Sequence, residues 1–236
     1  MTTQEGINEV RRATSDTATA TARQKRTDSI IVDKLNVAMR EFLRRTKAIK
    51  TEATLTLVAE TATVTVPSDF ICLDPDDIVG GYGGVILNSN PLKHTSIGLL
   101  DGLESGWRSA SSGIPGKWAF KDMNTILFHQ KPDATAAAYT CLLRHVKAAT
   151  ALSSGSLGAS LLDGVYGLIP YHHLLPYHAI AICAKEDGVQ EVGDRFTALW
   201  EAGMEKAEKD IKALFSTRGG FRADPSFVAQ QSRPPC

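Results

Sequence analysis

The 236-residue sequence has few cysteines and no cluster of them. Its cysteines Cys72, Cys141, Cys183 and Cys236 include no CxxC pair, which argues against a zinc knuckle and against a dense disulfide framework. We therefore expect reduced thiols in a protein made in a cytosol. Because Cys183 lies in the apolar run 179–184, we expect a buried, inert thiol and not a nucleophile.

Long apolar runs and an excess of one charge are also missing. The longest apolar stretches fall far short of the ~20 residues of a membrane span, so we expect a soluble protein with no membrane partner and no secretion signal. Basic and acidic residues number 26 each, and zero net charge disfavours a dedicated nucleic-acid binder. Net charge still alternates, with +5 over residues 1–50 and −6 over 51–112. This pattern fits contacts between complementary copies or neighbours, and equally an ordinary solvated surface.

Helical periodicity is present at both ends of the chain. The composition, 43% apolar and 22% charged, is sufficient for a buried core in one domain or at most two. We predict helices over 5–14, from a Thr27 cap to Lys47, after Pro170, and over 190–215. Pro176 predicts a kink or a delayed start in the third of these helices. The residues expected on the apolar face of the last helix are Val192, Phe196, Leu199, Trp200, Met204, Ala207, Ile211 and Leu214.

The middle of the chain alternates with a period of two, which is typical of strands. Leu55 and Leu57 alternate with threonine before Val64 and Val66 do the same, and this predicts a hairpin ending at Pro67. A second hairpin is expected from the runs 118–120 and 126–128. The overall prediction is an α+β fold, in which a helical bundle built from the N- and C-terminal helices carries an inserted antiparallel β-rich module and an extended terminal arm.

Four segments follow from this prediction. Residues 1–50 supply the N-terminal helices of the bundle, and 51–148 form the β-rich module with one short helix. Residues 149–215 contain a loop and the C-terminal helices, and 216–236 form an extended arm with no periodicity.

The chemical motifs that were considered all fail on residue type or spacing, so we expect no enzyme, no cofactor and no metal site. His172, His173 and His178 lack the i, i+4 spacing of a helical metal site and are expected to be packing or surface residues. Gly80–Gly84 and Gly113–Trp118 lack the phosphate-loop pattern and are expected to be turns.

Two charged groups also fit simple structural roles better than catalytic or binding roles. The acidic group Asp74, Asp76 and Asp77 contains Pro75 and lacks a closing Glu, which favours a solvated turn over a calcium loop. The basic residues near the N-terminus lack interleaved aromatic residues, which favours a solvated helix face or a protein contact over nucleic-acid binding. They are Arg11, Arg12, Arg23, Lys25 and Arg26.

The order of these signals resembles one known family, the head-to-tail adaptor proteins of tailed bacteriophages, also called neck, connector or head-completion proteins. The matching pieces, in chain order, are 7–12, 27–28, 35–41, 55–70, Trp107, 113–115, Trp118, 126–128, 132–134, Tyr139 and 169–173. The Thr/Ala-rich joint at 14–26, Pro176 and the Ser/Gly-rich loop at 149–164 depart from the family pattern.

The resemblance implies a structural virion protein located in the neck between capsid and tail and assembled in the host cytoplasm. It implies a ring of copies, commonly a dodecamer, that docks on the portal protein, receives a tail nozzle or tube protein, and leaves a channel through which DNA passes transiently during ejection. It also suggests that the β-rich module faces the tail or an adjacent subunit.

The arm is the expected portal-binding segment, because a chain without its own core becomes ordered on another protein's surface. Phe221 and Phe227 are the expected anchors, and the arginines are expected to pair with acidic groups. The complete set of expected portal-binding residues is Arg218, Phe221, Arg222, Phe227 and Arg233. The alternatives that stay open are a tail-tube or tail-terminator protein and, further from the pattern, an enzyme or a DNA-binding module.

Overall fold

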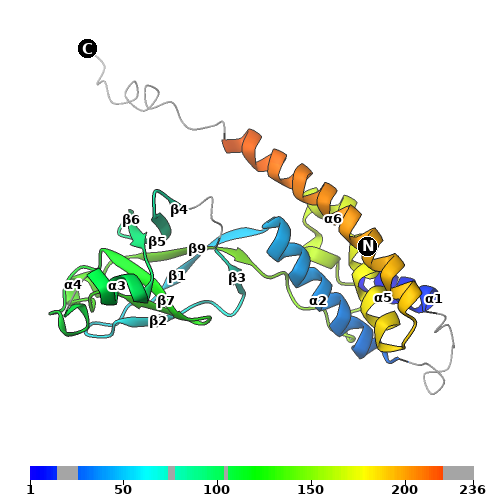
Figure 1. The fold of residues 1–236 in the computed structure, drawn as a ribbon, viewed down its shortest axis with the longest axis horizontal. Helices are drawn as coiled ribbons and strands as arrows, with labels where there is room; N and C mark the ends of the chain where they lie inside the picture. The colour runs from blue at the N-terminus through cyan, green and yellow to red at the C-terminus, as the bar shows by residue number, and fades with distance from the viewer. Residues whose placement is uncertain (15–25, 74–77, 104–105, 220–236) are drawn as a thin grey trace, which may run out of the picture. The chain divides into compact units, whose positions relative to one another are not determined.

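The computed structural model describes residues 1–14, 26–73, 78–103 and 106–219 (Figure 1). The protein is α+β, and its chain divides into two compact units. Met1–Thr46 and Leu152–Cys236 contribute to one, which we call the helical unit, and Lys47–Ala151 form the other, which we call the β-rich unit. Within the described residues, no helix is both long enough and apolar enough to cross a membrane.

The first two helices of the helical unit begin at side-chain caps. Helix α1 (Thr3–Ala13) starts with a capping box, in which the Glu5 amide donates to Thr2 Oγ1 at 3.3 Å and the Thr2 amide donates to Glu5 Oε2 at 2.7 Å. Helix α2 (Asp28–Thr46) follows Thr27, whose hydroxyl accepts from the Ile30 amide at 3.4 Å. The predicted Thr27 cap is therefore confirmed.

The C-terminal helices begin after two short 3-10 segments, Leu161–Gly164 and Tyr166–Tyr171. Helix α5 (Leu174–Glu186) has Pro176 as its third residue, in the first turn, where a missing N–H removes no intrahelical bond. The prediction of a delayed start is therefore confirmed. Helix α6 spans Gln190–Gly219.

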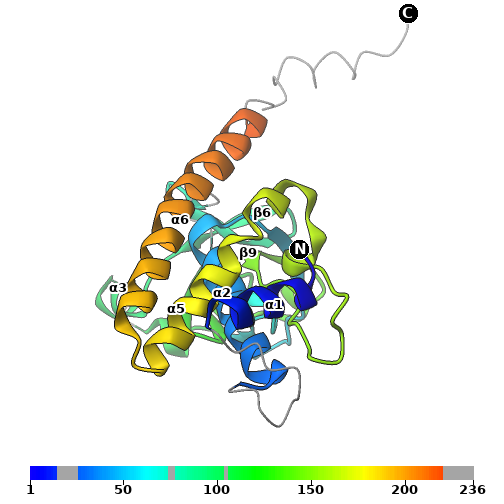
Figure 2. The same cartoon turned by 90° about the vertical axis from the view of Figure 1, so that its right-hand side faces the viewer.

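Helices α2 and α5 hold the helical packing together, because each of them contacts the other three long helices. Figures 1 and 2 both show α6 running along α5. Leu35, Phe42, Ile180 and Trp200 are all buried in this core. The buried face of α6 is narrower than predicted, because Leu199 and Leu214 are 42% and 56% exposed. The buried residues on this face are Trp200, Met204, Ala207 and Ile211.

The described part of the β-rich unit contains one mixed sheet. Its strands are β1 (Lys50–Leu55), β2 (Thr63–Thr65), β3 (Phe70–Cys72), β4 (Ile78–Val79), β5 (Tyr82–Leu87), β6 (Asn90–His94), β7 (Lys117–Asp122), β8 (Thr125–Phe128) and β9 (Cys141–Lys147). The strand order is β1-β9-β5-β6-β7-β8-β2, with β3 also pairing with β9 and β4 with β5. Short helices α3 (Ile97–Leu103) and α4 (Ala134–Ala137) and a 3-10 turn (Trp107–Ser109) complete the unit.

The predicted antiparallel module needs one correction, because β6 and β7 pair in parallel. A parallel pair cannot be joined by a tight turn, and the connection here contains α3. The Ser96 hydroxyl accepts from the Leu99 amide at 3.2 Å and so caps the start of α3.

The predicted hairpin between residues 55 and 66 is wrong. Strand β1 pairs along its whole length with β9, whereas β2 pairs with β8. Alternation in the sequence marks a strand but does not identify its partner. The second predicted hairpin is confirmed, since β7 and β8 pair antiparallel with Trp118 opposite Phe128.

Trp118 is the largest side chain in the core of the β-rich unit, and it is fully buried. Its indole N–H donates to the Gly83 carbonyl at 3.2 Å. A Cβ on Gly84, which has φ +70°, would lie 2.8 Å from the indole ring. Glycine is therefore required at position 84 for two reasons: the backbone is left-handed, and the Trp118 ring leaves no room for a side chain. The neighbouring Gly80 and Gly81, with φ of 62° and 85°, form a tight turn between β4 and β5. The turn predicted over Gly80–Gly84 is therefore shorter than expected, because Tyr82–Gly84 already belong to β5.

Candidate functional site

The histidines that were considered as ligands do not converge. His172 is buried, and burial, followed by the nearby Met1 amine, lowers its pKa to about 4. The ring of His178 packs against Trp200 at 4.6 Å, and burial lowers its pKa as well. His173 is exposed and lies beside Tyr177. The described residues hold no group of three potential metal ligands.

Cys183 is buried, as predicted, and burial raises the pKa of its thiol. A high thiol pKa keeps the side chain protonated and weakly nucleophilic. Asp74, Asp76 and Asp77 lie outside the described residues. His172, His178 and Cys183 therefore pack inside the helical unit and do not form a reactive group.

Two of the basic residues near the N-terminus belong to the core of the helical unit. Arg26 is 6% exposed; it donates to the Cys183 carbonyl at 2.7 Å and pairs with Asp187 at 2.5 Å. Arg11, at 7% exposed, pairs with Asp28 at 2.6 Å and donates to the Arg26 carbonyl. Both guanidinium groups are therefore structural, which corrects the expectation of a solvated basic face at these two positions.

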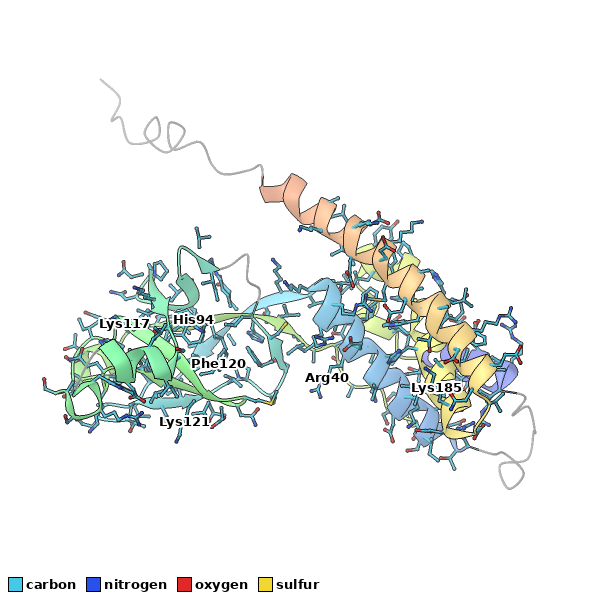
Figure 3. The ribbon with its side chains drawn as sticks, viewed as in Figure 1. Arg40, His94, Lys117, Phe120, Lys121 and Lys185 are labelled. Carbon is cyan, nitrogen blue, oxygen red and sulfur yellow. The ribbon has the colours of Figure 1, made fainter. Side chains whose placement is uncertain are left out.

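The other basic residues in this group are not buried in the same way. Arg12 is exposed and lies 3.5 Å from Glu9, and Arg23 and Lys25 lie outside the described residues. Figure 3 shows further cations on separate elements, with Arg40 on α2, Lys185 on α5, and Lys117 and Lys121 on β7.

The residues predicted to bind a portal lie at the end of the described chain. Arg218 belongs to the last turn of α6, which ends at Gly219. Phe221, Arg222, Phe227 and Arg233 lie outside the described residues. Helix α6 thus continues four residues beyond the predicted boundary at 215, so residues 216–219, which were expected in the extended arm, are helical.

A small pocket of about 250 Å³ lies between the start of α5 and the middle of α6. Its lining residues are Pro170, Tyr171, His173, Leu174, Gly203, Lys206 and Asp210. The Tyr171 hydroxyl donates to Asp210 Oδ2 at 2.8 Å, and burial together with this carboxylate raises the tyrosine pKa to about 12. Tyr171 therefore stays a neutral hydrogen-bond donor at ordinary pH.

Exposed apolar side chains adjoin this pocket in the sequence. Tyr166 is 87% exposed, and Val165 and Ile169 are also exposed. Sequence reasoning missed this group, because it lies in an irregular segment without periodicity. Exposed aromatic and aliphatic side chains of this kind are frequent in protein interfaces.

A groove in the β-rich unit lies between β1 and β2. It measures about 530 Å³ and is lined by Ala53, Thr54, Leu55, Thr56, Thr63, Val64, Thr65, Val66 and Pro67. These are the two strands at opposite ends of the sheet order, so the sheet curls until its end strands face the same groove. Its lining carries hydroxyl groups, aliphatic side chains and strand edges, which suit a polypeptide ligand better than a catalytic reaction.

Comparison with known proteins gives one family. The model of the family described as SU10 adaptor protein matches residues 1–223. The match spans the described residues of both compact units and ends inside the arm. No curated protein matches this chain.

Proposed function

The chain belongs to the SU10 adaptor protein family, and from this premise we propose that it is a structural virion protein, the head-to-tail adaptor of a tailed bacteriophage. The observation that carries the proposal is the extent of the family match, residues 1–223. An adaptor acts by binding other proteins, and adaptor proteins are not an enzyme class. The buried positions of His172 and Cys183 agree with this role.

In the proposed assembly, copies of the chain form a ring in the virion neck, with a dodecamer as the expected number. The ring docks on the portal protein at the capsid vertex, receives the tail nozzle or tube protein, and leaves a channel for DNA. Assembly takes place in the host cytoplasm. A channel for DNA passage has no use for base-stacking sites, which would hold the DNA in place.

We assign different tasks to the segments of the chain. The helices of residues 1–50 and 149–215 form the bundle that builds the ring, and the β-rich module of 51–148 faces the tail or the adjacent subunit. The arm of 216–236 reaches the portal. The observed division into a helical unit and a β-rich unit supports this assignment.

The portal contact is proposed to depend on the arm residues Arg218, Phe221, Arg222, Phe227 and Arg233. The phenylalanines supply apolar anchors, and the arginines pair with acidic groups on the portal. Aromatic and arginine side chains carry much of the binding energy in many interfaces. Because α6 continues to Gly219, residues 220–236 of the arm follow this helix directly in the chain.

Deletion of residues 219–236 tests the arm. The buried residues of the described helical core end at Ile211, so the truncated chain should unfold at the wild-type temperature but lose binding to purified portal protein. A full-length variant with Phe221→Ser and Phe227→Ser should also bind the portal weakly. This variant shows whether the two phenylalanine side chains, and not only the length of the arm, are needed for binding. A matched control with Met123→Ser, an 87% exposed residue of the β-rich unit, should bind normally. Portal binding by the truncated chain would overturn the assignment of the arm.

A further inference from the structure

The exposed side of α2 carries an acid, an aliphatic residue and a base in one row. Asp33, Val37 and Arg40 are spaced i, i+4 and i+7, so they share one side of the helix. Asp33 and Arg40 are exposed, and Val37 is 51% exposed. Figure 3 shows Arg40 projecting from α2. We call these three residues the α2 row.

The charged ends of the α2 row are not used inside the molecule. Within the described part of the chain, the side chains of Asp33 and Arg40 form no ion pair or hydrogen bond. The neighbouring cation Lys34, in contrast, pairs with Glu186 of α5. The row therefore offers an apolar side chain between two unpaired charges of opposite sign, which a surface of complementary charge can satisfy.

The pocket between α5 and α6 offers the complementary pattern. Lys206 and Asp210, a base and an acid one helical turn apart, both line it and are exposed. Lys206 forms no ion pair within the described residues. Asp210 accepts from the Tyr171 hydroxyl at 2.8 Å, and this neutral donor leaves the carboxylate charge uncompensated.

The pocket also has the size and the apolar lining that an aliphatic side chain needs. Its volume is about 250 Å³, and Pro170, Leu174 and Gly203 contribute to its lining. A cavity of about 150 Å³ already holds a benzene molecule, so a valine side chain fits here. Ile169, which precedes Pro170, is 46% exposed and adds apolar surface next to the pocket in the chain.

The α2 row and the pocket lie on different sides of the helical unit. Arg45 of α2 pairs with Glu201 and Glu208 at 2.7 Å, so this side of α6 faces α2. Lys206 and Asp210 are each two residues from Glu208, which is just over half a turn of a helix. The pocket rim therefore faces away from α2, and a chain cannot place its α2 row in its own pocket.

We propose that the α2 row of one copy docks into the α6 pocket of the next copy. Val37 enters the pocket. Asp33 pairs with Lys206 of the partner subunit, and Arg40 pairs with Asp210 of the partner subunit. The second copy is the occupant because both halves of this charge pattern belong to the same chain. The inference rests on the proposed function and deepens it, since a contact between two different surfaces closes into a ring when repeated around an axis.

The α2 row could also match itself in a twofold dimer, with Asp33 of each copy against Arg40 of the other. That arrangement leaves Lys206 and the pocket without a partner, and its symmetry stops the assembly at two copies. The pocket contact uses both surfaces, so it is the one we assign. The two arrangements differ in the effect that a change of Lys206 has on assembly.

Charge reversal at Asp33 and Lys206 tests the contact, because neither side chain has an ion pair whose loss would affect the fold. The measurement is the number of adaptor copies on each portal, by native mass spectrometry. The wild type should fill portals completely. Asp33→Lys and Lys206→Glu should each weaken the contact about tenfold and give partly filled portals, with unfolding temperatures as in the wild type. The double variant should fill portals again.

An equal mixture of the Asp33→Lys chain and the Lys206→Glu chain gives a second test. Complete rings should form, because alternating copies place Lys at 33 against Glu at 206 in one contact and the native pair in the next. The matched control Lys212→Glu makes the same charge change at an exposed position of α6 outside the pocket. This control should fill portals as the wild type does.

Complete filling by Lys206→Glu alone would overturn the inference, and together with a loss in Asp33→Lys it would identify the twofold contact instead. Partly filled portals from the double variant or from the mixture would also overturn it.

The inference and the proposed function fail separately. A wild-type chain that does not bind the portal would contradict the adaptor function, and the contact is then tested on the full chain alone. A photocrosslinker at position 37, in a concentrated mixture of ¹⁵N-labelled and unlabelled chains, should attach to the pocket residues of a second copy. Attachment to α2 of the second copy, or the absence of crosslinks between copies, would overturn the contact.

Discussion

At the scale of single residues, burial decides what the titratable groups do. His172, Cys183, Arg11 and Arg26 could each be mistaken for functional groups in the sequence, yet all four are buried. The Arg26–Asp187 pair connects the residue before α2 with the end of α5. Sequence reasoning predicted the burial of Cys183 from its apolar neighbours. It missed the pairing of Arg26 with the end of α5, because its partner carbonyl, that of Cys183, is 157 residues away and leaves no local signal.

His172 should make stability depend on pH. Its pKa is about 4 in the folded chain and about 6.5 when unfolded. Above pH 6.5 the ring is neutral in both states, but as pH falls towards 4 the unfolded chain takes up a proton that the folded chain does not. The free energy of unfolding should therefore fall by up to about 3 kcal/mol over this range.

Urea unfolding of wild type and His172→Gln between pH 7 and pH 4.5 measures this contribution. The variant should lose part of the acid sensitivity, while His173→Gln, which changes the exposed neighbour, should keep it. Equal pH slopes for the wild type and His172→Gln would show that this histidine is not held neutral by burial.

At the scale of secondary structure, local signals predicted the elements but not all of their partners. The start of α2, the delayed start of α5, the turn at Gly80 and the β7–β8 hairpin could all be predicted because caps, prolines, glycines and tight turns act over a few residues. The pairing of β1 with β9 could not, because its partners lie 86 to 96 residues apart. The groove between β1 and β2 depends on that pairing, so it was also beyond sequence reasoning.

The contact between α5 and α6 depends on Gly203. A Cβ at this position would lie 2.2 Å from Leu174 Cδ2, and Leu174 is 2% exposed. Gly203→Ala should therefore destabilise the fold by about 1 to 3 kcal/mol through overpacking, although alanine favours a helix by about 1 kcal/mol relative to glycine. Thermal or urea unfolding measures the effect.

Gly102→Ala is the matched control, because it lies in α3 and a Cβ there meets no atom within 4 Å. This variant should be neutral or more stable by up to about 1 kcal/mol. If Gly203→Ala were as stable as Gly102→Ala, the close approach of α5 and α6 would not require glycine.

At the scale of the whole molecule, the family match and the architecture lead to the same account. A chain with a helical unit and a β-rich unit offers separate surfaces for several proteins, as an adaptor requires. The order of sequence signals was sufficient to predict the family. The surfaces themselves became visible only in the structure: the exposed group around Tyr166, the pocket at Tyr171 and the groove between β1 and β2.

The mass of the assemblies formed by the purified full chain, measured by native mass spectrometry with and without portal protein, tests the central claim most directly. The account predicts a monomer alone and, with the portal, a complex of fixed stoichiometry that contains a closed ring of adaptor chains. A chain that stays separate from the portal, or that polymerises alone into open-ended tubes, would contradict the adaptor function.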